Sequence, residues 1–431
     1  MLRDWQEVLH PRHLFAGVQW LLFMFANTVV IPISIGDAMR MDTHAITASM
    51  QRSFFYTGLV SLLQLLFGHG LPIMEGQSGV WWGAILSVLT TAEESGLTSQ
   101  QAGGSLETGI VVAGVLIVLF GWLGMGNLLK KWFTPVASSV FLILLATELI
   151  SIFMKGMLGL SRHSRIDLPT TLLSMVLIVL VLVIQLSRYR SLRNYSILIG
   201  IGVGWVVYRL ALQSASASPQ TGIASLWQVI PWGAFGGDWG IILTAVAAGL
   251  INASNTVATL EGAQPLFNVR TSPQMYRRSF LITGLSTVLA GLFGLVPYAP
   301  YTSSLGFLRS TQIFSKIPFA IGSILFMVLG LVPAAGAFFA TLPVSVGDAV
   351  LLVAYLQIYG SAMTYLEGVT FTHRTIYRLA LPLLVGIGIF TIAAGAFVTL
   401  PAPLRPFLSN GLLVGVLLAI VMENALKWDV T

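Results

Sequence analysis

The chain of 431 residues is strongly apolar: hydrophobic residues make up 56% of it and charged residues only 9%. Because an ordinary soluble protein has about 25% charged residues, this composition excludes a water-exposed globular surface, and the apolar content excludes intrinsic disorder. The net charge of +6 comes from basic residues scattered between apolar runs, which favours membrane topology signals over a nucleic-acid interface. Cysteine is absent, so disulfides and thiolate metal sites are excluded.

A helix needs about 20 apolar residues to cross a bilayer, and apolar stretches follow one another along the whole chain. We therefore predict an all-α polytopic membrane protein with fourteen transmembrane segments. They are expected near residues 14–35, 53–69, 78–92, 106–126, 135–154, 168–186, 195–213, 239–258, 277–297, 303–315, 317–340, 343–360, 379–399 and 408–425. Lys and Arg concentrate in the loops that face inward when the N-terminus is cytoplasmic, which predicts that both termini are cytoplasmic.

Short motifs recur in the same order in the two halves of the chain. Residues 57–59 and 283–285 are both Thr-Gly-Leu, and residues 66–68 and 292–294 are both Leu-Phe-Gly, so that both pairs have an offset of 226. This pattern predicts a duplication of seven spans. Since seven is odd, the second copy would enter the membrane from the opposite side, giving a 7+7 inverted repeat of the kind found in secondary transporters.

Two segments rich in Gly and Pro fall at corresponding places in the two halves. Pro72 to Gly79 precedes the third predicted span, and Pro297 to Gly306 precedes the tenth. The apolar stretches that follow are too short to cross a bilayer, so each is expected to be a short extended segment followed by a half-helix. Two half-helix N-termini facing each other would present N–H groups and positive dipole ends to one ligand. The alternative is that the small residues serve tight helix packing.

In these motifs the chain resembles the nucleobase/ascorbate transporter family, which includes bacterial uracil and xanthine permeases, over nearly its whole length. Val18 to Leu22 is similar to the Gln-His segment of the family, with Trp20 in place of the histidine of many members. Gly76 to Gly79 is similar to its Gly-Ser-Ser-Phe element. The run from Arg278 to Tyr301 follows its ninth and tenth spans, and this places Ser303, Ser304 and Gly306 on its signature motif.

The resemblance implies fourteen spans divided between a core domain and a gate domain. The core would comprise residues 1–127 (spans 1–4) and 239–340 (spans 8–11), the gate residues 128–213 (spans 5–7) and 341–431 (spans 12–14), and residues 214–238 would link the repeats. It also implies a multi-pass homodimer in the bacterial inner membrane, a nucleobase substrate, and coupling to a proton or to sodium. No cofactor and no metal are expected.

The residues expected to bind the substrate lie in the first, third, eighth and tenth spans. They are Gln19, Gln77, Ser78, Gly79, Asn252, Ser254, Asn255, Tyr301, Thr302, Ser303 and Ser304. Ser254 marks, to within two residues, the place where the resemblance puts a substrate-binding glutamate. Both carboxylates of the family site are replaced by neutral side chains in this chain. We therefore expect the site to tolerate an anionic, oxidised purine such as urate or deprotonated xanthine.

Acidic and aromatic residues inside the predicted spans are further candidates. Glu148 and Asp348 would serve coupling or a hinge between the domains, or else would make structural hydrogen bonds. Glu107 is expected at a span entrance, in contact with solvent. Trp81 and Trp82 would either stack on a flat base or pack within the protein.

Together these features predict a secondary active transporter for a nucleobase that works by alternating access, and not an enzyme. One alternative is an anion transporter on the same fold, like the sulfate and bicarbonate exchangers. Another is an uncoupled facilitator or channel, which would differ in that its uptake would not concentrate the substrate or collapse with an uncoupler.

Overall fold

The structure, a computed structural model, describes residues 10–425 except 126–130, 161–164, 190–191, 194, 213–225 and 402. Within these residues, all regular structure is helical apart from one pair of short strands. Both chain ends and residues 214–225 of the predicted linker lie outside the described residues, so the predicted orientation of the termini stays a prediction.

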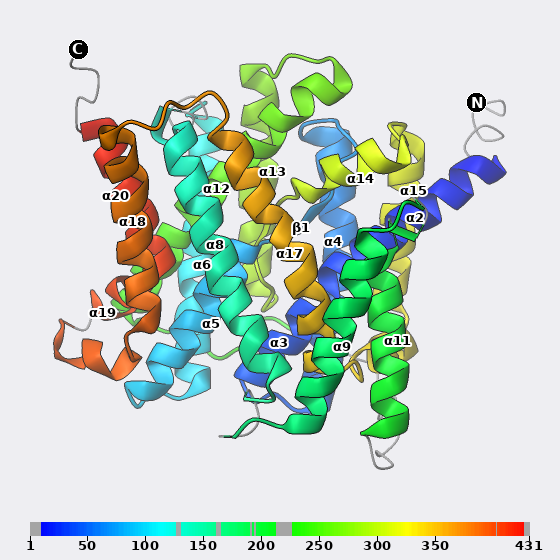
Figure 1. The fold of residues 1–431 in the computed structure, drawn as a ribbon, viewed down its shortest axis with the longest axis horizontal. Coiled ribbons are helices and arrows are strands. Elements are labelled where there is room, and N and C mark those ends of the chain that lie inside the picture. The colour runs from blue at the N-terminus through cyan, green and yellow to red at the C-terminus, as the bar shows by residue number, and fades with distance from the viewer. Residues whose placement is uncertain are drawn as a thin grey trace.

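The elements follow the chain as shown in Figure 1. The first half contains α2 (Pro11–Thr28), α3 (Val30–Ala38), α4 (Thr43–Phe67), β1 (Glu75–Gln77), α5 (Gly79–Glu94), α6 (Ser99–Trp122), α8 (Pro135–Met157), α9 (Leu168–Gln185) and α11 (Ser196–Ala211). The second half contains α12 (Trp239–Phe267), α13 (Pro273–Leu292), β2 (Tyr298–Pro300), α14 (Ser303–Thr311), α15 (Lys316–Leu331), α16 (Pro333–Phe339), α17 (Val344–Tyr365), α18 (His373–Thr391), the 3₁₀ helix η1 (Ala394–Thr399), α19 (Arg405–Leu408) and α20 (Gly411–Ala425).

Each of the fourteen predicted ranges overlaps a helix or a pair of helices. Among the described residues, seven helical segments are long and apolar enough to cross a membrane, or eight if α15 and α16, bent by 89° at their junction, form one span. The remaining helices are too short or too polar to qualify by length and composition alone. The chain is thus a multi-pass, all-helical protein, and the count of fourteen spans stays a prediction.

Helix α4 begins about ten residues before the predicted second span. Asp42 caps it, since its Oδ1 accepts a hydrogen bond from Ala45 N at 2.7 Å. Gln51 and Arg52 lie outside the predicted range, which starts at residue 53, but both are buried inside the helix. Hydropathy cannot distinguish a solvated polar residue from one that is buried against a neighbouring helix.

The two halves of the chain interlock. Helix α6 of the first half packs along α13 of the second, and α15 packs against both α2 and α4. The backbones of α6 and α13 come close at two glycines: a Cβ at Gly114 would lie 2.6 Å from Val288 N, and one at Gly284 would lie 2.6 Å from Val118 N. Small residues that let helix backbones approach in this way are typical of membrane bundles.

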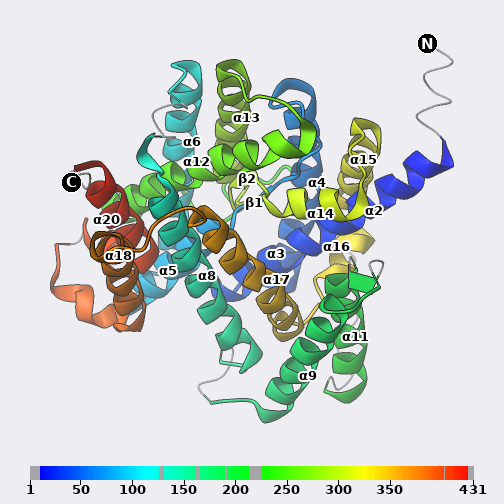
Figure 2. The same cartoon turned by 45° about the horizontal axis from the view of Figure 1, so that its top comes forward.

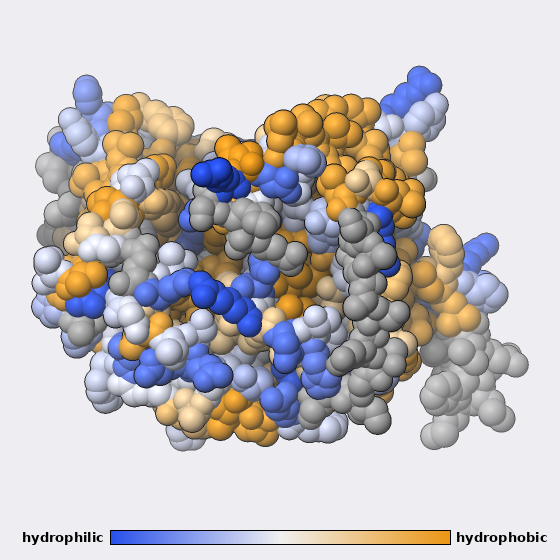
Figure 3. Space-filling model, turned by 90° about the horizontal axis from the view of Figure 1, so that it is seen from below, coloured by the Kyte–Doolittle hydropathy of each residue, from blue (hydrophilic) through white to orange (hydrophobic). Residues whose placement is uncertain are grey.

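The strands lie in the interior and the apolar surface lies outside. Figure 2 shows β1 and β2 in the middle of the molecule, surrounded by α4, α12, α13 and α14. Helix α9 exposes large apolar side chains, among them Leu172, Val176, Val179 and Val183, as expected of a face in contact with lipid. In Figure 3, hydrophilic residues gather over the centre and lower part of the face, while apolar residues occupy much of its upper margin.

The close contact of α6 and α13 gives a testable prediction. Gly284→Ala should destabilise the protein by roughly 1–3 kcal/mol, because the new methyl group meets backbone atoms that cannot move aside. Gly202→Ala is the matched control, since a Cβ there meets nothing within 4 Å. Thermal unfolding of the purified protein in detergent should show a lower midpoint for Gly284→Ala alone. Equal midpoints for the two variants would contradict this account of the packing.

Candidate functional site

Strands β1 and β2 pair in antiparallel fashion, and all six of their residues are buried. The paired residues are Glu75 with Pro300, Gly76 with Ala299, and Gln77 with Tyr298. Two further backbone hydrogen bonds extend the pair, from Ser78 N to Pro297 O (2.8 Å) and from Tyr301 N to Met74 O (2.9 Å). The extended backbone therefore satisfies its polar groups within the protein, as non-helical backbone at membrane depth must. The two predicted extended segments are thus confirmed, each followed by a helix.

The start of α5 is tied to α12 by side chains. Ser78 caps α5, accepting a hydrogen bond from Val80 N at 3.2 Å, and its hydroxyl donates to Asn252 Oδ1 at 2.5 Å. Asn252 Nδ2 in turn donates to Tyr298 O of β2 at 3.0 Å. Asn255, one turn further along α12, donates to Asn252 Oδ1 at 3.1 Å. The structure thus brings Ser78, Asn252 and Asn255, three of the predicted site residues, into one hydrogen-bonded group.

The start of α14 offers accessible polar groups. Thr302 and Ser303 are exposed, whereas Ser304 is buried and accepts a hydrogen bond from Met74 N at 3.2 Å. The Thr302 hydroxyl lies 2.9 Å from that of Thr259, which also donates to Pro300 O at 3.1 Å. A Cβ at Gly306 would meet nothing within 4 Å, so one side of the first turn of α14 is open.

The helix starts refine the correspondence between the two halves. Helix α5 starts at Gly79 and α14 starts at Ser303, 224 residues later, whereas the sequence motifs recur at an offset of 226. By helix start, Thr302 is therefore the counterpart of Ser78, and Ser304 lies one position inside the first turn. The side chain of Thr302 makes no capping bond to its helix. Its hydroxyl instead lies on the α12 side, beside Thr259.

The Tyr301 side chain packs on the backbone of β1 at Gly76 and Gln77. Its hydroxyl donates to Gln77 O, and a Cβ at Gly76 would lie 2.8 Å from the Tyr301 ring. Glycine at residue 76 is therefore required by the close approach of this ring. Tyr301 is half-buried and lies near a second tyrosine, Tyr355 of α17. Tyr355 was not among the predicted site residues. A Cβ at Gly79 would lie 3.6 Å from the Tyr355 hydroxyl, so this tyrosine faces the start of α5.

Three predicted site residues point elsewhere. The Gln77 amide is buried and donates to Ser53 Oγ of α4 at 3.1 Å. Ser254 is buried and donates to Ile251 O of its own helix at 2.7 Å. Gln19 is half-buried and lies beside Tyr195, which precedes α11. Their predicted role in binding stays a prediction, and the recorded contacts of these side chains go to other elements.

The two predicted coupling acids lie where separate parts of the bundle meet. Glu148 of α8 is buried against α5, and a Cβ at Gly83 would come within 2.7 Å of Glu148 Oε2. It also lies beside Asn410, just before α20. Asp348 of α17 is buried against Gly156 of α8 and lies near Asp37 of α3.

Two acids differ from what their sequence context indicated. The prediction that Glu107 contacts solvent is wrong. This residue is fully buried, and its Oε1 accepts a hydrogen bond from Trp232 N at 3.0 Å. Residues 232–236 pack over the start of α6 and cover it. Glu75 is fully buried in β1, where its Oε1 accepts a hydrogen bond from Thr283 Oγ1 of α13 at 2.6 Å. In the sequence Glu75 is one polar residue of the break before the third predicted span, and nothing in its neighbours indicates burial.

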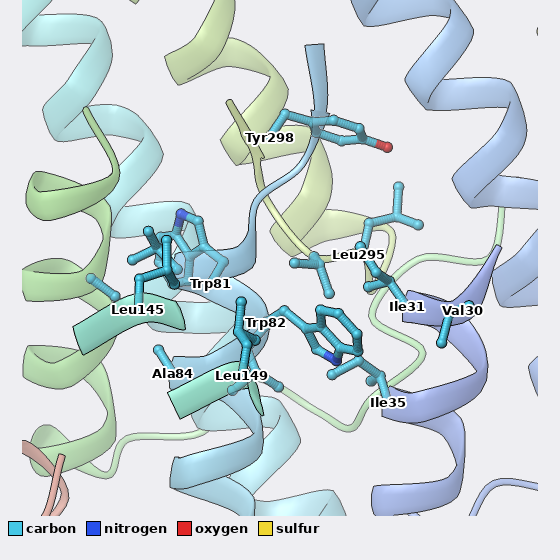
Figure 4. Close-up of a cluster of buried hydrophobic side chains, with 14 of the residues drawn as sticks. Val30, Ile31, Ile35, Trp81, Trp82, Ala84, Leu145, Leu149, Leu295 and Tyr298 are labelled. Atoms are coloured by element: carbon cyan, nitrogen blue, oxygen red, sulfur yellow. The ribbon is translucent and has the colours of Figure 1, made fainter. Parts of the chain in front are cut away.

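The indole pair after the break packs within the protein. Trp81 and Trp82 are both 0% exposed. Figure 4 shows their rings among Leu145 and Leu149 of α8, Ile35 of α3, and Leu295. Trp82 Nε1 donates to Ser34 Oγ at 3.1 Å. Packing is thus the interpretation that the structure favours over stacking on a ligand. In the part of the chain that is described, no cluster of three or more His, Cys, Asp or Glu residues could hold a metal ion.

Comparison with known sequences gives one family. Residues 11–395 match the xanthine/uracil permease profile, described as "Permease family". The "Putative purine permease YwdJ" of Bacillus subtilis (strain 168) is 28% identical over 419 residues, covering 96% of this chain and 95% of that protein. The "Xanthine permease" of the same organism is 23% identical, covering 94% of this chain and 92% of its own length. The "Uric acid permease PucJ", also from this organism, is 24% identical, covering 94% and 91%.

Solved structures give the same fold at low sequence identity. The transmembrane domain of the cyanobacterial bicarbonate transporter BicA has a TM-score of 0.63 at 15% identity, covering 95% of this chain and 96% of its own. The murine anion transporter Slc26a9 in its inward-facing state has a TM-score of 0.62 at 12% identity, covering 95% and 68%. At such identities the likeness concerns the fold alone.

The hydrogen bonds of Ser78 give a second prediction. Ser78→Ala removes both the cap of α5 and the bond to Asn252, and should cost about 1–2 kcal/mol of stability. Ser254→Ala is the control, because that hydroxyl binds only a carbonyl of its own helix. Chemical or thermal unfolding in detergent measures both. A loss for Ser254→Ala as large as that for Ser78→Ala would mean that the link from α5 to α12 contributes nothing.

Proposed function

Because the chain belongs to the xanthine/uracil permease family, we propose that it is a secondary active transporter whose substrate is a purine base. As a permease it is a transporter and not an enzyme. The observation that carries the proposal is the group formed by Ser78, Asn252 and Asn255 beside the open first turn of α14. The printed names of the relatives, which refer to purines, xanthine and uric acid, support the same substrate class.

The chemistry of this group suits the edge of a planar heterocycle. Amide and hydroxyl side chains each offer a donor and an acceptor, and purine bases present alternating N–H and C=O groups. Asn255 is half-buried, while Thr302 and Ser303 are exposed, so unused hydrogen-bonding capacity faces outward from the paired helix starts. The N-terminal ends of α5 and α14 add positive partial charge. No carboxylate takes part in the recorded contacts of these residues, so an oxidised purine in its anionic form is the favoured substrate.

The proposed movement is alternating access between two bodies. The core would contain residues 1–127 and 239–340, and the gate residues 128–213 and 341–431. Glu148 and Asp348 both sit on proposed gate helices. Glu148 faces α5 of the proposed core, and Asp348 packs on α8 of the gate with Asp37 of the core helix α3 nearby. A buried acid at such a contact would change its hydrogen bonding as the bodies slide, which suits a hinge role for both.

The alternative of an anion transporter rests on the likeness in fold alone, whereas the family match favours a nucleobase transporter. We propose coupling to protons and not to sodium. Uptake by an uncoupled facilitator would refute both kinds of coupling. In a bacterial host lacking its own purine uptake, labelled xanthine should accumulate above the external concentration. An uncoupler should collapse the accumulation. Uptake that only equilibrates, with or without the uncoupler, would identify a facilitator.

The site itself is tested by substitution. Asn252 is fully buried and holds Ser78, Asn255 and Tyr298 in place through hydrogen bonds. Asn252→Ala should therefore raise the KM for xanthine about ten-fold, because losing these bonds, worth about 1–1.5 kcal/mol each, displaces the groups that bind the base. Asn424→Ala is the matched control: Asn424 is an exposed residue of α20 that binds Ile420 O of its own helix at 2.8 Å. Uptake of labelled xanthine, urate and uracil should be compared at equal amounts of membrane-inserted protein. An unchanged KM for Asn252→Ala, or preferred uptake of uracil by the wild type, would contradict the proposed site.

A further inference from the structure

Glu75 is an acid in a place where a strand has no structural need for one. It is 0% exposed, and the pairing of β1 with β2 does not use its side chain. Ser61 of α4 accepts a hydrogen bond from Glu75 N at 3.1 Å and donates to Glu75 O at 3.3 Å. These bonds anchor the backbone of β1 to α4 without using the carboxyl group. The carboxyl group calls for another explanation.

The surroundings of the carboxyl group are polar but neutral. Thr283 of α13 donates to Oε1, and the Gln64 amide of α4 lies beside the same carboxyl group while donating to Thr283 Oγ1 at 3.0 Å and to Ser279 O at 3.2 Å. Across the strand pair, the partner residue is Pro300. The second oxygen, Oε2, is buried and makes no hydrogen bond to the protein.

The ionisable side chains of the surrounding elements are engaged elsewhere. His69, in the turn after α4, accepts a hydrogen bond from Leu71 N at 3.1 Å and faces Lys316. Arg52 of α4 lies with Tyr56 and Glu107. The phenol of Tyr298 of β2 lies beside Thr57 of α4. None of these, among the described residues, figures in the interactions of the Glu75 carboxyl group.

An ionised carboxylate with no cation beside it is strongly disfavoured in such a place, so in this conformation the neutral acid is the stable form. Ionisation requires that water or a cation reach Oε2, which means a different arrangement of the helices around β1. The carboxyl group would therefore hold a proton in one conformation and release it in another. That is the property a proton-coupled transporter needs in one of its residues.

Glu75 is also mechanically connected to the proposed substrate site. The next residue, Gly76, lies under the ring of Tyr301, and Ser78, three residues on, is bound to Asn252. The partner strand carries Tyr298, whose carbonyl accepts the hydrogen bond of Asn252. Any displacement of β1 when Glu75 gains or loses its proton is therefore transmitted to the residues that hold the starts of α5 and α14.

We propose that Glu75 carries the coupling proton of this transporter. The carboxyl group takes up a proton from the side at higher proton concentration, stays neutral while the purine site is formed, and releases the proton to the opposite side when β1 becomes hydrated. The inference rests on the proposed function, since it assigns the coupling step of the same site. Proton uptake and release then take place on β1, and Glu148 and Asp348 serve the movement between the proposed core and gate.

The test separates coupling from transport in proteoliposomes that contain the purified full chain. Glu75→Gln keeps the shape and removes the titratable group. It should exchange labelled xanthine against internal xanthine at a rate close to that of the wild type, yet lose accumulation driven by an imposed pH gradient. Glu107→Gln, a change at another fully buried glutamate, is the matched control and should retain driven accumulation.

A second variant keeps the acid and guards against a folding defect in the first. Thr283→Val removes the hydroxyl that binds Oε1 while keeping the side-chain shape, and should alter the pH profile of driven uptake without abolishing exchange. Driven accumulation by Glu75→Gln, or an unchanged pH profile for Thr283→Val, would overturn the assignment. So would exchange by the wild type without any response to a pH gradient. If the wild type exchanged no purine at all, the proposed function would be the part that fails.

Discussion

Backbone polar groups inside a membrane must find partners within the protein, and this constraint shapes the centre of the molecule. Two stretches of chain leave helical geometry at the same depth, one in each half. Each supplies hydrogen bonds to the other, through the pairing of Glu75 to Gln77 with Tyr298 to Pro300, and Ser61 of α4 satisfies the backbone of Glu75. The halves are therefore not independent units. A membrane protein with only one such break would leave these N–H and C=O groups without partners.

The strand pairing positions the helices that surround it. It brings the starts of α5 and α14 to the same level, next to α12, whose Asn252 joins the first helix start to the second strand. Accessible polar groups, positive helix ends and a nearby tyrosine from α17 follow from this placement. The acid of β1 is buried by the same packing, which is why one strand can both shape a binding site and carry a titratable group.

The sequence predicted these features to different depths. The two breaks and the helices after them were predictable, because Pro and Gly at matching positions of a repeat exclude continuous helices. The contact of Ser78 with Asn252 was not, since 174 residues separate them and only the packing of α5 on α12 brings them together. Burial of Arg52, Glu75 and Glu107 was missed for a related reason: hydropathy treats a charged residue as solvated, whereas its neighbours in space decide. Gln19 shared a family motif, yet its contact is with Tyr195.

In the proposed transporter, the paired strands and the helix starts beside them form the purine site. An experimental structure of the protein with xanthine bound would test it most directly. Density for the base is expected next to Asn255 and the first turn of α14, within hydrogen-bonding distance of Ser303 or Thr302. Density for xanthine elsewhere in the bundle, with no density for the base beside the strand pair, would contradict the proposed site.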